Sequence, residues 1–197
     1  MAALSESPAT AVGQVSADGQ FRWDGQQWVP IPTGSREPTP WTRPMQLASA
    51  AFFTLQALYS VIISVLFINH DTMLRVMKAQ GTSIPQGTDI DTVLNISIFF
   101  ALAFVIVIAV LELVAALGSY MGWRWMFWAA LVLFGLGGIG ALTNLGTFAH
   151  PDTSPIPVGA VAVSEVFAIC SAAMFVWLLI GVIRFGPWAM KRPGAYT

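Results

Sequence analysis

Charged residues are scarce in this chain, since Asp, Glu, Lys and Arg together make up 10% of its 197 residues. A soluble domain carries about 25%. Hydrophobic residues reach 56%, which is more apolar surface than a soluble core of this size can hide, so we expect a lipid bilayer to surround most of the chain. The formal net charge is -1, and we expect no nucleic-acid partner because no basic surplus is present.

Residues that carry out chemistry are also few. Cys170 is the only cysteine, which excludes a disulfide within the chain and any Cys-x-x-Cys site. His70 and His150 are the only histidines and further metal ligands are scarce, so we expect no metal and no cofactor. The sequence has no glycine-rich phosphate loop before a lysine and no Gly-x-Ser-x-Gly motif. We therefore expect a protein that is not an enzyme.

Four apolar stretches are each long enough to cross a bilayer as a helix, which takes about 20 residues. They run over residues 45–67, 93–118, 125–147 and 158–183. The predicted fold class is an all-α membrane protein, a four-helix transmembrane bundle with a small N-terminal β-hairpin in a mostly disordered tail. The predicted domains are a tail of residues 1–44, a transmembrane domain of residues 45–183 and a C-terminal tail of residues 184–197.

Basic residues at the ends of the four stretches predict their orientation. One side of the bundle collects Arg36, Arg43, Arg124, Arg184, Lys191 and Arg192. The other side has Arg75 and Lys78. The more basic side also carries a belt of tryptophans, namely Trp41, Trp123, Trp125, Trp128 and Trp188. We therefore expect a multi-pass plasma-membrane protein with both termini in the cytoplasm.

The N-terminal tail contains one patterned segment, at about residues 20–29. The pair Asp24-Gly25 predicts a two-residue β-turn. In that register Phe21 lies opposite Trp28, and Phe21, Trp23 and Trp28 share one face. A lone hairpin is only marginally stable. The segment is therefore either an element that docks on a protein partner or the membrane surface, or a weakly ordered aromatic tail.

Two connecting segments have recognisable patterns. Residues 33–44 are rich in Pro, Ser and Thr, which predicts a linker. Residues 71–81 predict a short amphipathic helix with Met73, Leu74 and Met77 on one face, ending at a glycine. The alternative is that this segment continues the first span.

Two carboxylates fall within the apolar stretches, Glu112 in the second and Glu165 in the fourth. From the rise of a helix, they lie about 9 Å and about 27 Å from the cytoplasmic boundary. A separation of roughly 18 Å along the membrane normal excludes a shared-proton pair. Each carboxylate is either a proton or cation site, or a structural hydrogen-bond donor between helices, and the structural interpretation is favoured.

Neutral polar residues lie at matching depths. Ser64 and Asn144 are level with Glu165, and Thr54 and Gln56 are nearest to Glu112. Because Gln56, Ser60 and Ser64 recur every four residues, we expect a polar stripe on the first span that faces the bundle interior.

Small residues are concentrated in the third and fourth stretches. The third contains Gly135, Gly137, Gly138, Gly140 and Ala141, and the fourth has Ala160, Ser164, Ala168 and Ala172 at every fourth position. Small residues let helix backbones approach closely. These two spans are therefore expected to pack against each other or against a second copy of the chain, as a homo-oligomer.

Three segments carry a resemblance. They are Asp71–Gly81 with Asp89–Val93, the turn Gly122–Trp125, and the element from Trp23 to Trp28. Together they resemble a loose group of small actinobacterial four-helix membrane proteins of unknown function, whose turn is usually more basic. The third segment resembles a short Trp-rich motif attached to many membrane proteins of those bacteria. The resemblance covers most of the chain and implies no catalytic residues.

These patterns favour a non-enzymatic accessory or partner-binding subunit that works in the lipid bilayer. The alternative is a small transporter or ion-conducting protein that uses Glu165 and Glu112. The two alternatives differ in whether the carboxyl groups must ionise.

Overall fold

The computed structural model describes residues 11–32, 36–79, 81, 89–149 and 154–193, and of residues 143–145 it describes the backbone alone. The described chain is mostly helical and has small antiparallel strand pairs. In chain order the elements are β1 (Phe21–Trp23), β2 (Trp28–Pro30), β3 (Glu37–Pro38), α1 (Thr42–Phe67), α2 (His70–Ala79), α3 (Ile90–Tyr120), α4 (Arg124–Ala149), α5 (Val158–Arg184), the short 3-10 helix η2 (Pro187–Ala189) and β4 (Met190–Lys191).

The four long helices α1, α3, α4 and α5 cover the four predicted stretches. Each contains 26 to 31 residues and is long and apolar enough to cross a membrane. At 1.5 Å per residue their lengths are about 39 to 46 Å. The hydrocarbon core of a bilayer is about 30 Å thick, so each helix is longer than that thickness. The prediction of a mainly helical fold with four long apolar helices is confirmed.

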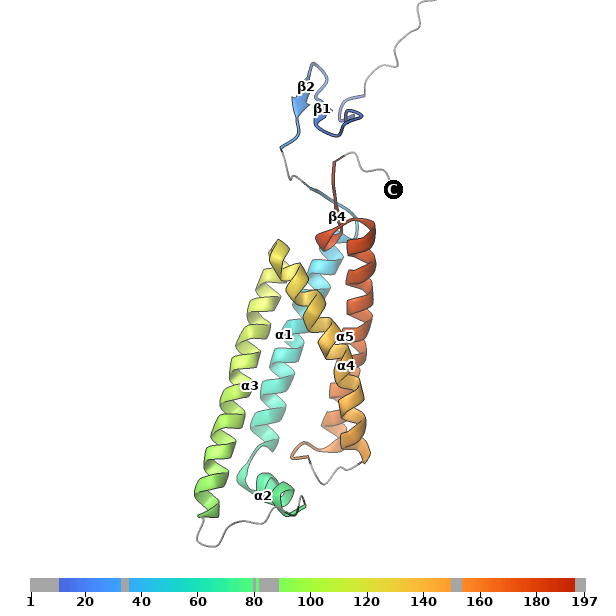
Figure 1. The fold of residues 1–197 in the computed structure, drawn as a ribbon. Helices are drawn as coiled ribbons and strands as arrows, with labels where there is room; N and C mark the ends of the chain where they lie inside the picture. Colours follow the sequence, from blue (N-terminus) through green and yellow to red (C-terminus); the bar gives the residue numbers. More distant parts are fainter. Residues whose placement is uncertain (1–10, 33–35, 80, 82–88, 150–153, 194–197) are drawn as a thin grey trace, which may run out of the picture.

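These helices form two antiparallel pairs, α1 with α3 and α4 with α5 (Figure 1). The short strands and the C-terminal segment lie at one end of the bundle, called here the termini end, and α2 lies at the opposite loop end (Figure 1). Buried side chains join the two pairs in the half nearer the termini end. The largest of them are Met45, Phe53, Phe127, Phe134, Leu178 and Trp188.

Small residues bring α4 and α5 close together, as predicted. A Cβ atom added at Gly137 would lie 2.6 Å from the Ser171 hydroxyl oxygen, and one at Gly138 would lie 3.0 Å from Ala172 Cβ. The close approach therefore depends on the absence of side chains on this face of α4. Packing of these helices against a second copy stays a prediction.

Strands β1 and β2 pair antiparallel, which confirms the hairpin and corrects its register. Trp23 lies opposite Trp28, where the sequence had placed Phe21. The predicted two-residue turn is wrong because Asp24 Oδ1 accepts hydrogen bonds, both 2.7 Å long, from the backbone N–H groups two and three residues ahead. Those bonds close a four-residue loop. Since the register moves by two residues, Phe21, Trp23 and Trp28 still share one face.

A third segment, which the sequence analysis missed, lies beside β1. Val15 forms an isolated bridge with Arg22, and the backbone N–H of Gly13 donates to the Trp23 carbonyl at 2.8 Å. The intervening turn has Gly19 in the left-handed region, at φ +71°. Residues 11–31 are therefore one small folded unit, called here the β module.

The prediction of a linker over residues 33–44 is wrong for residues 36–44, which are folded. Residues 33–35 lie outside the described residues. β3 pairs antiparallel with β4, so this segment is joined to the C-terminal segment. The hydroxyl groups of Thr39 and Thr42 both donate to the Ala189 carbonyl, at 2.8 and 3.1 Å. Composition predicted flexibility, but these long-range hydrogen bonds fix the segment.

The predicted C-terminal tail, residues 184–197, is folded over its described part, 184–193. Trp188 is 1% exposed and lies in the left-handed region, at φ +56°. Together with the positive φ of Ala189, this turns the chain back over the end of α5. The sequence pattern missed this because the contacts that hold the turn come from distant parts of the chain.

Helix α2 confirms the predicted short helix in the first loop, with its start at His70. It does not continue α1, because Ile68 leaves the helical region with ψ at 90°. Val76 is buried, and the predicted apolar residues Met73, Leu74 and Met77 are half-buried. Gly81 ends the segment at φ +64° and donates to the Lys78 carbonyl.

Candidate functional site

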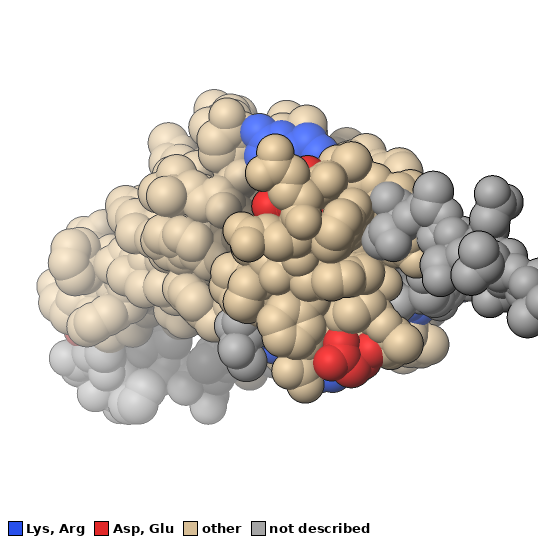
Figure 2. All heavy atoms as spheres, turned by 90° about the horizontal axis from the view of Figure 1, so that it is seen from above, with Lys and Arg blue, Asp and Glu red and all other residues tan. Residues whose placement is uncertain are grey.

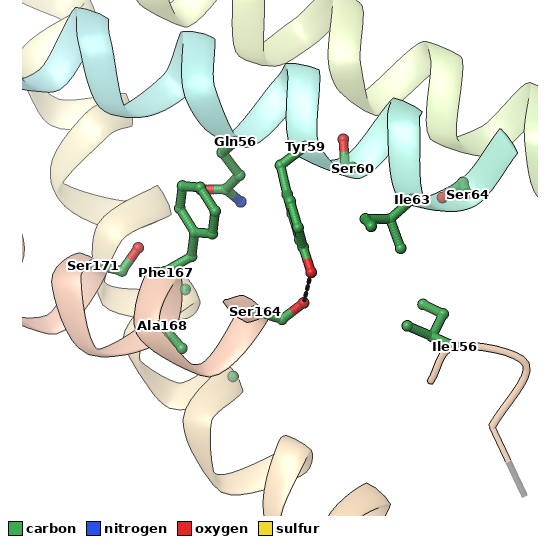
Figure 3. Close-up of a pocket in the computed structure, with 12 residues that line it drawn as sticks. Gln56, Tyr59, Ser60, Ile63, Ser64, Ile156, Ser164, Phe167, Ala168 and Ser171 are labelled. Carbon is green, nitrogen blue, oxygen red and sulfur yellow. Dashed lines mark hydrogen bonds between the residues drawn. The ribbon is translucent and has the colours of Figure 1, made fainter. Parts of the chain in front are cut away.

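A cavity of about 280 Å³ lies between α1, α4 and α5, on the loop side of the buried core (Figure 3). We call it the bundle pocket. Gln56, Tyr59, Ser60, Ile63 and Ser64 line it from α1, while Gly137 and Gly140 line it from α4. Ser164, Phe167, Ala168 and Ser171 line it from α5, and Ile156 lies just before that helix. The pocket therefore opens where buried side chains no longer join the two helix pairs.

The predicted polar stripe of α1 forms one wall of this pocket. Gln56, Ser60 and Ser64 all line it, which confirms that the stripe faces inward. The helix rises about 12 Å between the first and last of these residues, and this rise sets the extent of the pocket along the bundle. Ser164 and Ser171 of α5 stand across from the stripe (Figure 3).

Tyr59 reaches across the pocket, and the sequence analysis missed it. Its hydroxyl group donates a hydrogen bond to the Ala160 carbonyl of α5, and the Ser164 hydroxyl oxygen lies 3.4 Å from the Tyr59 oxygen (Figure 3). Its ring lies 5.2 Å from the Phe167 ring, centroid to centroid. The sequence could have indicated it, because Tyr59 follows Gln56 by three residues and therefore lies on the same face of the helix as the polar stripe.

Aromatic rings fill the bundle between this pocket and the termini end. Phe52 packs edge-on against Phe134 and Phe167, with centroid separations of 5.1 and 5.7 Å. Phe53 stacks on Phe134 at 4.8 Å. Because interiors of this kind are close-packed, the four rings close the pocket on this side.

The described lining of the pocket contains no charged side chain. Its hydroxyl and amide groups donate and accept hydrogen bonds. Ile63, Ile156 and Phe167 add apolar surface beside them. This combination fits an uncharged group that can form hydrogen bonds, whereas an ion would meet no opposite charge on the described walls.

Glu112 lies on α3 and does not line the pocket. Its side chain is half-buried, and within the described residues its Oε2 atom is buried without a hydrogen-bond partner. The predicted neighbours do not bond to it: Thr54 donates to the Ala50 carbonyl of its own helix, and Gln56 faces the pocket. The prediction was wrong here because equal depth does not place two side chains on facing sides of their helices.

Glu165 lies on α5, half-buried, and is also outside the described pocket lining. It is not without an interaction partner. Ser64, one of its two predicted partners, is buried and faces the pocket. The side chain of Asn144 lies outside the described residues, so its predicted contact with Glu165 stays a prediction.

Glu112 and Glu165 belong to different helix pairs, α1–α3 and α4–α5. Among the described residues, no three His, Cys, Asp or Glu side chains are close enough together to hold a metal ion. His150 lies outside those residues, and His70 lies 3.0 Å from Asp91 in a contact between α2 and α3.

The predicted aromatic face of the β module forms a second candidate site. The Trp23 and Trp28 rings lie 5.6 Å apart with a tilt of 59° between their planes. Trp28 is 40% exposed and Phe21 36% exposed. Large aromatic side chains that are partly exposed on one face are common in protein-binding surfaces.

The bundle pocket and this aromatic face are the two candidate binding sites of the described residues. Both follow from geometry alone. The resemblance to small actinobacterial membrane proteins stays a prediction, because comparison of the chain with protein-family models, with curated proteins and with solved structures gives no match.

Proposed function

We propose that this chain is a non-enzymatic, multi-pass plasma-membrane protein that acts by binding, as an accessory or partner-binding subunit. Both termini then lie in the cytoplasm, since the termini end carries the excess of Arg and Lys. The observation that carries the proposal is the bundle pocket. Its described walls are uncharged and mainly apolar, they include hydroxyl and amide groups, and aromatic rings pack on the side toward the termini end.

The occupant that this pocket fits best is an uncharged amphiphile with a hydroxyl or ester group, such as a diacylglycerol. The pocket lies within the depth of the spans, where such molecules are dissolved. Binding pockets for small molecules have volumes of about 300 to 1,000 Å³. At about 280 Å³, this pocket accommodates the polar part of an amphiphile while its acyl chains stay in the bilayer.

The alternative, a small transporter or ion-conducting protein that uses Glu112 and Glu165, has less support. Neither carboxylate belongs to the described lining of the pocket. A conducting path from the pocket to the termini end would also have to pass the rings of Phe52, Phe53 and Phe134.

The test is to fill the pocket with a side chain. Gly140 lines the pocket, and a Cβ atom added there meets no atom within 4 Å, so Gly140→Leu adds a large side chain at the pocket wall. Gly146→Leu is the matched control, because Gly146 lies on the same helix, is exposed and also has open space at its Cβ. The probe is a photoactivatable diacylglycerol, added to the full chain reconstituted in phosphatidylcholine vesicles.

We expect photolabelling of the peptides that carry Tyr59 and Ser164, reduced severalfold by Gly140→Leu and unchanged by Gly146→Leu. Equal labelling of both variants and the wild type would overturn the ligand assignment. Proton or cation flux into the same vesicles that disappears in Glu165→Gln, at unchanged thermal stability, would replace the proposal by the transporter alternative.

The aromatic face of the β module supports a further binding role, recruitment of a cytoplasmic protein. The contact between Trp23 and Trp28 supports it, because the pair fixes a rigid, half-exposed aromatic surface. Trp28→Ala should abolish cross-linking to a partner while leaving membrane insertion intact. Val29→Ala is the control, since Val29 is also 40% exposed but points to the opposite face of β2. Equal losses in both variants would contradict docking through the aromatic face.

A further inference from the structure

Three arginines from distant parts of the chain line a second cavity, of about 800 Å³, between the β module and the bundle. Arg36 precedes β3, Arg124 is the first residue of α4, and Arg192 follows β4. Viewed from the termini end, the surface of the molecule is mostly uncharged (Figure 2). We call the three side chains the arginine cluster.

Arg36 is held in place by the fold. Its guanidinium group donates a hydrogen bond to the Met190 carbonyl at 3.1 Å. It packs on Gly186, where a Cβ atom would collide with it. Gly186 is also at φ +105°, a conformation that other residues rarely adopt. The turn after α5 is therefore shaped to admit this guanidinium group.

Within the part of the chain that the structure describes, no ion pair compensates the positive charge of the cluster. Among the described residues, the salt bridges involve Arg22 and His70, and none involves the arginine cluster. Burial, and after it the charges of Arg124 and Arg192, lower the pKa of Arg36 from its ordinary value. The repulsion between the three groups costs free energy unless an anion lies between them.

Among the described residues that line this cavity, the one carboxylate is that of Asp18, and one of its two oxygens is engaged in local hydrogen bonds. Asp18 Oδ1 accepts from the Ser16 hydroxyl and from the Gln20 backbone N–H. The N-terminus of α4, which begins at Arg124, is a second source of positive potential. The first backbone N–H groups of a helix have no partner within that helix, and they carry a partial positive charge.

The arginine cluster lies level with the ends of the long helices at the termini end. Arg124 stands where α4 begins, and Arg36 packs on Gly186, two residues after α5 ends. The ends of membrane-spanning helices lie at the headgroup level of a bilayer. Trp123 and Trp125, which flank Arg124, stack at 5.7 Å, and tryptophans are enriched at this level.

We propose that the arginine cluster binds the phosphate group of an anionic phospholipid in the leaflet at the termini end. A guanidinium group donates two parallel hydrogen bonds to a phosphate, and basic pockets beside membrane helices hold lipid headgroups. A free phosphate offers the same chemistry. The level of the cluster favours the lipid, whose headgroup enters sideways from the bilayer between α4 and the β module.

The test uses the purified full-length chain in mild detergent and counts bound molecules by native mass spectrometry. The probes are short-chain phosphatidylglycerol, the corresponding phosphatidylcholine and inorganic phosphate. The variant is Arg124→Gln with Arg192→Gln, which leaves the hydrogen bond of Arg36 to Met190 intact. Arg184→Gln is the matched control, because Arg184 is an exposed basic residue at the same end and lies outside the cavity.

We expect wild type to bind one phosphatidylglycerol at least tenfold more tightly than phosphatidylcholine. At about fivefold for each arginine, the double variant should lose about 25-fold in that affinity, while Arg184→Gln stays within about twofold of wild type. Equal affinity of wild type for the two lipids overturns the proposal without requiring any variant to fold. An equal loss in Arg184→Gln would assign the effect to general surface charge, and binding of inorganic phosphate as tight as that of phosphatidylglycerol would rule out the lipid assignment.

Discussion

Trp188 Nε1 donates a hydrogen bond, 2.9 Å long, to the backbone carbonyl of Trp123. The bond connects the segment after α5 to the turn between α3 and α4, sixty-five residues earlier in the chain. Trp188 also packs edge-on against Phe127 at 5.3 Å. One side chain therefore joins the C-terminal segment to both helix pairs at the termini end.

Trp188→Phe should destabilise the protein. Phenylalanine keeps the aromatic contact with Phe127 but removes the indole donor, so the Trp123 carbonyl keeps only the 3.3 Å hydrogen bond from the Phe127 backbone N–H. The loss of one such hydrogen bond costs about 1 kcal/mol. The measurement is thermal unfolding in detergent. Trp125→Phe is the control, because Trp125 is 59% exposed, and it should change stability by less than about 0.5 kcal/mol. Equal shifts in the two variants would contradict a specific role for the hydrogen bond.

Gly137→Ala should weaken the packing of α4 on α5. The added Cβ would lie 2.6 Å from the Ser171 hydroxyl oxygen and 3.1 Å from Ser171 Cβ. Such overpacking costs about 1 to 3 kcal/mol. Adding Ser171→Gly removes both atoms and should restore part of the loss, which a double-mutant cycle on thermal stability measures. Gly146→Ala is the control, because its Cβ has open space, and it should be neutral or stabilising. Purely additive losses from Gly137→Ala and Ser171→Gly would show that the two residues do not contact each other.

Glu112→Met should stabilise the protein, whereas Glu165→Leu should destabilise it. Within the described residues, Glu112 Oε2 is buried and unpartnered, so removing it relieves a desolvation cost of about 1 kcal/mol. Glu165 has an interaction partner, and its loss should cost about 0.6 kcal/mol, while Glu165→Gln keeps a donor of the same size. Thermal unfolding in detergent compares the three variants. If Glu112→Met lowers stability, the half-buried carboxylate is a required contact.

The two ends of the bundle should lie on opposite sides of the membrane. Ala17→Cys, in the β module, should resist a membrane-impermeant thiol reagent in intact cells, and Lys78→Cys, in α2, should react. Both variants are made in a Cys170→Ala background, since Cys170 is exposed on α5. The opposite labelling pattern would invert the orientation deduced from Arg and Lys.

The four spans could be predicted because each depends on a property of its own segment. An apolar run of sufficient length, such as the one in α3, forms a helix in lipid whatever its neighbours are. The facing of Gln56, Ser60 and Ser64 was predictable for a similar reason, since a four-residue repeat fixes one face of one helix.

Features that depend on particular side-chain hydrogen bonds, local or between distant segments, could not be predicted. The hairpin register was set by the Asp24 side chain, and the order of residues 36–44 by hydrogen bonds to Ala189. Tyr59 was missed because its role comes from the position of Ala160 on another helix. Glu112 was assigned partners at its own depth, but depth does not give the rotation of a helix about its axis.

The hydrogen bonds of Thr39 and Thr42 to Ala189 connect positions 150 and 147 residues apart. The chain between these partners contains all the helices of the bundle. During synthesis, Thr39 and Thr42 are made long before Ala189. The hydroxyl groups of Thr39 and Thr42 therefore lack their Ala189 acceptor until the chain has been made past α5. The free-energy cost of closing such a loop grows only with the logarithm of its length. The contact between β3 and β4 therefore cannot form before Met190 and Lys191 have been made. A chain that stops before Ala189 lacks the acceptor of Thr39 and Thr42.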